Sequence, residues 1–152
     1  MLEVQVQYGL SRAGWPAPAT LHRAVRAAWR GPGAAQVVVR IVDAREGLRL
    51  NRDFRGRERP TNVLSFPAPP EANVPGRPVL LGDIVLCAPV LAEEAGAQGK
   101  DLRAHFAHMA VHGMLHLQGL DHRTREEAEA METIERQILG GLGYPDPYAE
   151  TC

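Results

Sequence analysis

The chain of 152 residues contains only two cysteines, a single lysine and no long apolar run. Cys87 and Cys152 are far apart and fit no Cys-x2-Cys spacing, which excludes the common cysteine-based metal motifs. No stretch approaches the roughly eighteen apolar residues that a membrane-spanning helix needs. The start of the chain, Met1-Leu2-Glu3, lacks the basic and apolar segments of a secretion signal. These absences predict a cytoplasmic protein with reduced thiols and no membrane partner.

The charges are balanced, with a formal net charge of -1, so the surface as a whole has no bias toward polyanions. Arginine is nevertheless concentrated between positions 45 and 59, where the local net charge is +3. The arginines of this segment are Arg45, Arg49, Arg52, Arg55, Arg57 and Arg59. A local anion site is one interpretation of the cluster. A solvated helix face with charge pairs one turn apart is the other.

Hydrophobic periodicity predicts four strands and five helices. The strands are expected at 2–7, 37–42, 63–66 and 79–87, and the helices at about 20–28, 43–54, from 89 onward, 101–118 and 124–138. Asp43, Asp101 and Thr124 are residue types that cap helix N-termini, and Gly82 inside the last strand indicates a bulge. Because helices and strands do not simply alternate, we expect an α+β fold, with one domain spanning 1–152.

The segment His112-Gly-Met-Leu-His116-Leu-Gln-Gly119-Leu-Asp121-His122 is the part of the chain most informative about function. On a helix, His112 and His116 lie one turn apart on one face, about 5 to 6 Å between Cβ atoms, so both imidazoles can reach one metal ion. Gly119 suits the left-handed residue that ends a helix, and a reversal there would return His122 to the same point. Three nitrogens at about 2.0 to 2.1 Å would then bind a zinc-like ion. For any single histidine, a place on the helix surface is the alternative.

The spacing His-x3-His-x5-His is shared with the metzincin proteases, with one difference. Those proteases carry a glutamate base directly after the first histidine, where this chain has Gly113, which can accept no proton. Three histidines without a nearby fourth ligand resemble a catalytic site with one open coordination place. The candidates for a fourth protein ligand are Asp83, Cys87, Asp121 and Cys152.

Three further residues lie close to the histidine motif in the sequence. Asp121 is expected to orient a ligand imidazole or to act as a base, and a solvated aspartate is the alternative. His108 continues the four-residue stripe of the expected helix, so it is expected to flank the site or to contact substrate. For His108 and for His105, a solvated or core-edge histidine is the other interpretation.

Four segments of the chain resemble one known family, the bacterial YbeY-type rRNA maturation endoribonucleases. The matching segments are 51–67, 81–84, 108–122 and 143–148. The chain departs from the family at Leu120, where tyrosine is common, which removes a ring on which a base could stack. It also has Arg57-Glu58 in place of a lysine–acid pair, which leaves the charge unchanged.

This resemblance implies a zincin-like α+β domain in which a mixed sheet of about four strands packs with about five helices. It implies Zn²⁺ on His112, His116 and His122, although the same nitrogens also suit Ni²⁺ and other divalent transition metals. It further implies cleavage of single-stranded RNA in 16S rRNA maturation and ribosome quality control. The implied partners are rRNA, the small ribosomal subunit and ribosome-assembly GTPases. Arg55 maps onto the family's catalytic arginine, with Arg59 as the alternative and as a substrate contact.

The expected chemistry is hydrolysis of a phosphodiester. A metal on three histidines lowers the pKa of bound water from about 15.7 toward 7, which would make a glutamate base unnecessary. Arg55 would stabilise the negative charge on the phosphoryl group, and Asp121 would serve as a base. Whether water or the ribose 2′-hydroxyl attacks stays open. A metalloprotease with another carboxylate as base, and a non-catalytic RNA-binding factor in ribosome assembly, are the alternative functions.

Overall fold

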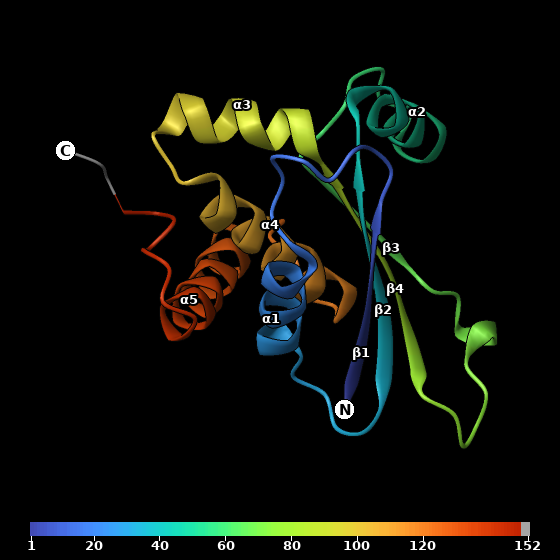
Figure 1. The fold of residues 1–152 in the computed structure, drawn as a ribbon. Helices are drawn as coiled ribbons and strands as arrows, with labels where there is room; N and C mark the ends of the chain where they lie inside the picture. The colour runs from blue at the N-terminus through green and yellow to red at the C-terminus, as the bar shows by residue number, and fades with distance from the viewer. Residues whose placement is uncertain (150–152) are drawn as a thin grey trace.

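The computed structural model describes residues 1–149, which form a sheet, five α-helices and a short 3-10 helix (Figure 1). In chain order the elements are β1 (Leu2–Tyr8), α1 (Pro18–Ala28), β2 (Ala35–Val42), α2 (Ala44–Arg55), β3 (Val63–Pro67), η1 (Pro70–Ala72), β4 (Val79–Cys87), α3 (Ala88–Gln98), α4 (Leu102–Leu117) and α5 (Arg125–Gly141). The predicted α+β class, with four strands and five α-helices, is confirmed. Across the described residues, no helix combines the length and the apolar character that crossing a membrane requires.

The sheet is mixed, with the strand order β1-β2-β4-β3. β1 pairs with β2 and β2 pairs with β4 in parallel, whereas β3 pairs with β4 antiparallel. The register of β2 and β4 shifts next to Val37, and Gly82 follows the shift with a φ of 132°. A Cβ at Gly82 would lie 2.1 Å from the backbone oxygen of Phe66, so the predicted bulge is confirmed and requires glycine. β3 is left as an edge strand of this sheet.

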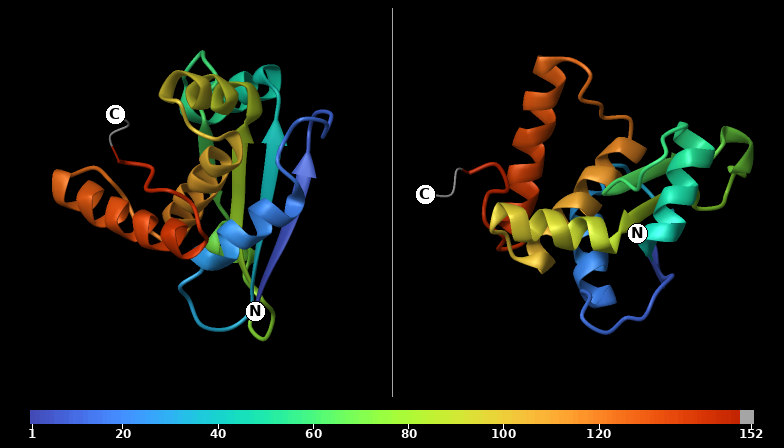
Figure 2. Two further views of the ribbon diagram at one scale, coloured as in Figure 1. Left: turned by 60° about the vertical axis from the view of Figure 1, so that its left-hand side comes forward. Right: turned by 90° about the horizontal axis from the view of Figure 1, so that it is seen from above.

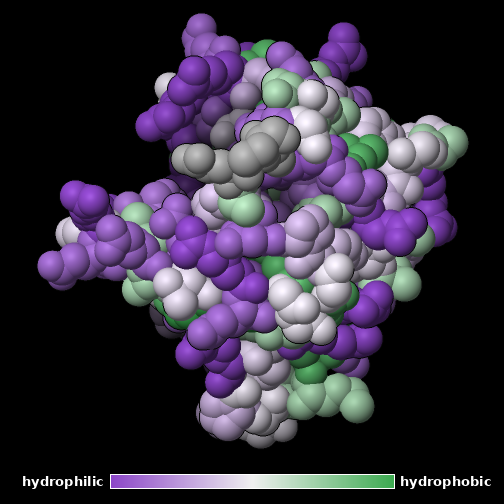
Figure 3. Space-filling model, turned by 90° about the vertical axis from the view of Figure 1, so that its left-hand side faces the viewer, coloured by the Kyte–Doolittle hydropathy of each residue, from purple (hydrophilic) through white to green (hydrophobic). Residues whose placement is uncertain are grey.

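Helices α1, α4 and α5 lie on one face of the sheet, and α2 lies near one end of the other face (Figures 1 and 2). Along β4, Ile84 and Leu86 belong to the main core with α4, while Val85 and Cys87 belong to a smaller cluster with residues of α2 and β3. This alternation is the period-two pattern of a strand that is covered on both faces. The side of the molecule that carries α5 is mostly hydrophilic, with its apolar residues in small separate groups (Figure 3).

Helix α4 is the central helix and carries the histidine motif. Phe106, Ala110 and Met114 are fully buried on it, and the Asp101 carboxylate caps it by accepting from the backbone N–H of Ala104 at 3.2 Å. The helix ends in a left-handed Gly119 with a φ of 96°. The backbone N–H groups of residues 119 and 120 donate to the carbonyls of residues 116 and 115, a Schellman motif. The helix stop predicted from the glycine is confirmed.

At the start of α2, where Asp43 is predicted to cap the helix, only half of a capping box forms. The Asp43 side chain accepts from the backbone N–H of Glu46 at 2.9 Å, as predicted. The Glu46 carboxylate pairs instead with both Nε and Nη2 of Arg40, at 2.5 and 2.9 Å. A bidentate, charge-assisted pair is stronger than a single bond to a backbone N–H, which explains the choice.

Gly113 lies where α4 packs most closely on β3 and β4. A Cβ there would lie 2.8 Å from Cγ2 of Ile84, 3.2 Å from Oγ of Ser65 and 3.3 Å from Cγ2 of Val63. The Ser65 hydroxyl also donates to the carbonyl of Gly113 at 3.2 Å. The position at which the metzincins carry their glutamate therefore faces the sheet and has no room for a side chain.

Replacing Gly113 by alanine is expected to destabilise the fold by about 1–3 kcal/mol, because the added methyl group overpacks this contact. Urea unfolding followed by circular dichroism measures the change. Gly96→Ala is the matched control, since its Cβ would meet nothing within 4 Å and alanine favours the helix by up to about 1 kcal/mol. Equal stability of Gly113→Ala and the parent chain would show that the contact can relax.

Candidate metal centre

Three histidines meet at one point near the C-terminal end of α4. His112 and His116 belong to α4, and His122 to the loop that follows it. One nitrogen from each ring lies within 4.8 Å of the other two, and the Nε2 atoms of His112 and His116 are 3.1 Å apart. Nitrogens at about 2.0 to 2.1 Å from a tetrahedral ion lie roughly 3.3 Å from one another. The group therefore fits a single transition-metal ion.

The lowered pKa of His116 and the hydrogen bond of His112 to Glu135 both suit metal binding. Burial lowers the pKa of His116, and the nearby His112 and His122 lower it further. The His116 imidazole is therefore neutral at neutral pH, which is the form that binds a metal. His112 Nδ1 lies 2.6 Å from Oε1 of Glu135. Since a carboxylate only accepts, the ring proton of His112 is on Nδ1 and its Nε2 lone pair faces the other ligands.

Glu135 is the residue that organises the buried side of the centre. Its side chain, on α5, is 1% exposed. Besides His112, it accepts from His108 Nε2 at 2.6 Å and from the Tyr148 hydroxyl at 2.5 Å. Burial alone would raise the pKa of Glu135, but the hydrogen bonds from the two histidines and the tyrosine outweigh it and lower the pKa to about 2. The carboxylate is thus ionised and fully engaged, and it fixes the orientation of His112.

Tyr148 reaches Glu135 from the C-terminal segment. Burial and the bond to Glu135 both raise the pKa of Tyr148, so its phenol stays protonated and donates. The segment is held by Lys100, whose Nζ donates to the carbonyl of Pro147 at 2.9 Å, and by Arg136, whose guanidinium lies 5.2 Å over the Tyr148 ring. The end of the described chain is therefore part of the support of the metal centre.

Replacing Glu135 by glutamine is expected to lower the affinity for a divalent metal by about 10- to 100-fold, the usual cost of losing a carboxylate behind a metal-bound histidine. The amide nitrogen of glutamine cannot accept, so at least one of the three donors loses its partner. Competition with a zinc chelator measures the affinity. Glu129→Gln, an exposed change on the same helix, is the control, and an affinity of Glu135→Gln equal to that of the control would contradict this role.

The three histidines line a pocket of about 470 Å³ that lies between α4 and the edge strand β3. Its other lining residues are Arg55, Asn62, Val63, Leu64, Ser65 and Pro67. Nη2 of Arg55 donates to the backbone carbonyl of Ser65 at 2.9 Å, and the guanidinium lies 5.8 Å over the Phe66 ring. These contacts hold the Arg55 guanidinium at the wall of the pocket that contains the histidines.

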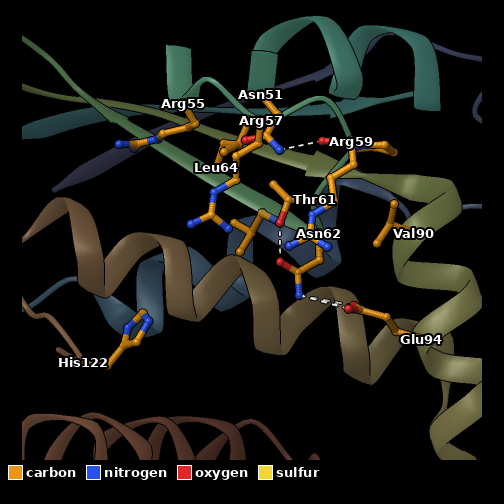
Figure 4. Close-up of a pocket in the computed structure, with 12 residues that line it drawn as sticks. Asn51, Arg55, Arg57, Arg59, Thr61, Asn62, Leu64, Val90, Glu94 and His122 are labelled. Atoms are coloured by element: carbon orange, nitrogen blue, oxygen red, sulfur yellow. Dashed lines mark hydrogen bonds between the residues drawn. The ribbon is translucent and has the colours of Figure 1, made fainter. Parts of the chain in front are cut away.

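A second pocket of about 610 Å³ adjoins the first (Figure 4). The residues that line both are Arg55, Asn62, Val63, Leu64 and His122. Arg57 and Arg59 also line this pocket, and the backbone carbonyl of Arg59 accepts from the Asn51 side chain. The other arginines of the cluster are not among the lining residues. Arg45, Arg49 and Arg52 are exposed on α2. The cluster therefore divides into a pocket-facing part and a solvated part.

The remaining candidate residues lie outside the pocket that contains the histidines. His108 is only 5% exposed and is bonded to Glu135 and Tyr148, so it flanks the histidine group on its buried side, and the substrate contact expected from sequence stays a prediction. His105 is also buried. The Asp121 carboxylate accepts from the backbone N–H of His122 at 2.7 Å and pairs with Arg123 at 2.9 Å. These contacts suit a role in holding the His122 turn, and its role as a base stays a prediction.

The candidates for a fourth ligand do not join the histidines within the described residues. Asp83 lines a different pocket, on the sheet side near Gln5 and Val38. Cys87 is 1% exposed and contacts the backbone oxygen of Asp43. Cys152 lies outside the described residues.

Sequence reasoning missed Glu135 and Tyr148. The signal for Glu135 was present, because the inward stripe of α5 consists of Met131, Glu135 and Leu139, all about 1% exposed. An acid in an otherwise apolar stripe needs a buried partner. Tyr148 gave no comparable local signal, because it lies in an irregular segment after α5.

The fold and the site together define an α+β domain with a three-histidine centre that could hold a metal ion. Arg55 lines the same pocket as the three histidines. A family model described as "Endoribonuclease YbeY" matches residues 19–143, and the chain belongs to this family. Two relatives with the same description, from Stenotrophomonas maltophilia (strain K279a) and Xanthomonas axonopodis pv. citri (strain 306), are each 53% identical over 97% of this chain and 94% of their own length. The solution structure of TM1509 from Thermotoga maritima is similar in fold, with a TM-score of 0.58 and 24% identity over 99% of this chain and all of that one.

Proposed function

We propose that this protein is a metal-dependent endoribonuclease that cuts single-stranded RNA, with rRNA of the small ribosomal subunit as substrate. The observation that carries the proposal is the single pocket lined both by His112, His116 and His122 and by Arg55. Family membership supports RNA as the substrate class. We further propose a role in 16S rRNA maturation and quality control in the cytoplasm, with ribosome-assembly GTPases as partners.

The proposed metal is Zn²⁺, held by His112, His116 and His122. Three imidazole nitrogens with one open place are a typical catalytic zinc site, and Ni²⁺ fits the same donors. When bound, the ion supplies Lewis-acid polarisation of a phosphoryl oxygen and lowers the pKa of water. Glu135 keeps the His112 lone pair directed at the ion. The Asp121 contact with the His122 backbone shapes the turn that presents the third nitrogen.

Arg55 is the proposed catalytic residue. A planar guanidinium offers parallel N–H donors that match two phosphoryl oxygens. Its bond to the Ser65 carbonyl orients the group before substrate arrives, so little reorganisation is needed as negative charge develops. Arg57 and Arg59 line the adjoining pocket, where they would bind neighbouring phosphates of the strand.

The experiment joins metal analysis to RNA cleavage. Protein freed of metal by a chelator is reconstituted with Zn²⁺ or Ni²⁺ and incubated with a 5′-labelled single-stranded RNA and with the matching duplex. The expected result is metal-dependent internal cutting of the single strand only. A 2′,3′-cyclic phosphate on the product would assign the first attack to the ribose hydroxyl, and its absence would favour direct attack by water.

Two outcomes would contradict the proposal and support a different function. Metal-dependent cleavage of a peptide, with RNA untouched, would indicate a protease, although the close packing of Gly113 leaves no room for a protease-type glutamate. Tight binding of rRNA without cutting, in the presence of every metal tried, would indicate a non-catalytic assembly factor.

A further inference from the structure

We propose that the pocket beside the metal centre recognises a guanine base of the RNA through the carboxylate of Glu94. The inference rests on the proposed function, because it takes RNA as the substrate. It assigns base specificity to a residue that takes no part in holding the metal.

Glu94 stands out among the residues that line this pocket. In Figure 4 it lies at the opposite end of the pocket from His122, with Arg55 and Arg57 on the side between them. Among the described lining residues it is the one acid, against the three arginines Arg55, Arg57 and Arg59. A phosphate would be repelled at the Glu94 end and attracted at the arginines. The strand backbone is therefore expected along the arginines, with a base directed toward Glu94.

The Glu94 carboxylate is held rigidly by residues of two other segments. His105 Nε2 lies 2.9 Å from Oε1, and the Asn62 amide lies 3.3 Å from both oxygens (Figure 4). Burial lowers the pKa of His105, so the ring is neutral and donates its Nε2–H. The Asn62 amide spans both oxygens of Glu94, so it occupies the face that a base with two adjacent donors would use. The side chain of Glu94 is 31% exposed, and such a base would take the place of these two long contacts while the shorter contact with His105 stays.

The two acceptor oxygens of the Glu94 carboxylate favour guanine over the other three RNA bases. Guanine carries two adjacent N–H donors on its Watson–Crick edge, N1–H and N2–H, which match the two oxygens of a carboxylate. Cytosine offers a donor only at N4, and adenine and uracil each place an acceptor beside their donor. Unpaired RNA bases are commonly read on this edge. The side chain of Val90, which also lines the pocket, offers an apolar contact for the ring.

The test compares RNAs as well as proteins, so that it does not depend on the folding of one variant. Fluorescence anisotropy measures binding of U-rich pentamers with guanosine, inosine, cytidine or adenosine at the centre, to the metal-loaded parent chain and to the metal-free His116→Ala variant, which is not expected to cut them. Inosine keeps N1–H and lacks the N2 amino group. Guanosine is expected to bind about 10- to 100-fold more tightly than inosine, the range for a hydrogen bond to a charged group.

The protein variants assign that preference to one side chain. Glu94→Gln, which keeps the size of the side chain, is expected to reduce the guanosine preference to less than about threefold. Glu93→Gln, an exposed change at the next position of α3, is expected to leave it unchanged. Equal binding of guanosine and inosine by the parent chain, a cytidine preference, or a preference that survives Glu94→Gln would overturn the inference. RNA cutting without base preference contradicts only this inference, whereas guanosine preference without cutting contradicts only the proposed function.

Discussion

Replacing His116 by alanine is expected to leave the purified protein with much less than one metal ion per chain and to reduce RNA cleavage to background. His116 supplies a nitrogen 3.1 Å from that of His112, and its removal leaves two imidazoles, one fewer than the three protein ligands of a typical catalytic zinc site. The loss should exceed the 10- to 100-fold expected for Glu135→Gln, because a ligand itself is removed. Elemental analysis of purified protein and a single-stranded RNA assay measure the two effects.

The matched control for this variant is His22→Ala, since His22 is half-buried on α1 and does not belong to the histidine group. Its metal content and cleavage rate should equal those of the parent chain. The free energy of unfolding of both variants, measured in chelator, separates loss of the site from loss of the fold. Full cleavage by metal-free His116→Ala would remove the metal from the proposed chemistry.

Replacing Arg55 by alanine is expected to reduce turnover by about 10²- to 10³-fold while metal content stays at the parental level. This is the usual effect of removing one preorganised donor from a site where negative charge develops. Arg55 is exposed and its backbone ends α2, so the change should have little effect on stability. Arg55→Lys keeps the charge but loses the planar guanidinium, and its turnover should lie between that of Arg55→Ala and that of the parent chain.

The control on the same helix is Arg49→Ala, which removes an exposed arginine outside both pockets. Its turnover should match that of the parent chain at the same ionic strength. A fall of equal size in both variants would indicate general electrostatic attraction of RNA. A fall confined to Arg59→Ala would move the catalytic role to the alternative that the sequence left open.

Much of the fold could be predicted because local signals agreed with the tertiary structure. Asp101 and Gly119 mark the two ends of α4 by capping preferences that act within a few residues. The four-residue spacing of His112 and His116 has a geometric meaning on any helix. Strand order, by contrast, depends on which strands pair across the core, and the sequence pattern alone did not give β1-β2-β4-β3.

The support of the metal centre could not be predicted for a similar reason. Glu135 is 23 positions from His112, and Tyr148 is 40 positions from His108, so no spacing rule links them. The same distance in sequence explains why the bonds of His108 to Glu135 and Tyr148 were not predicted, since α5 and the C-terminal segment supply both partners. Its contact with substrate stays a prediction.

The contact at Gly113 has a consequence for the width of the reactive cleft. One wall of the cleft is β3 and the other is α4, and the two walls meet where the Ser65 hydroxyl bonds to the Gly113 carbonyl. Because Gly113 has no side chain, α4 packs closely on the sheet. Any larger residue at this position would push the walls apart and carry the histidines away from Arg55. The distance between the histidine group and Arg55 is thus set in part by a residue that has no side chain of its own.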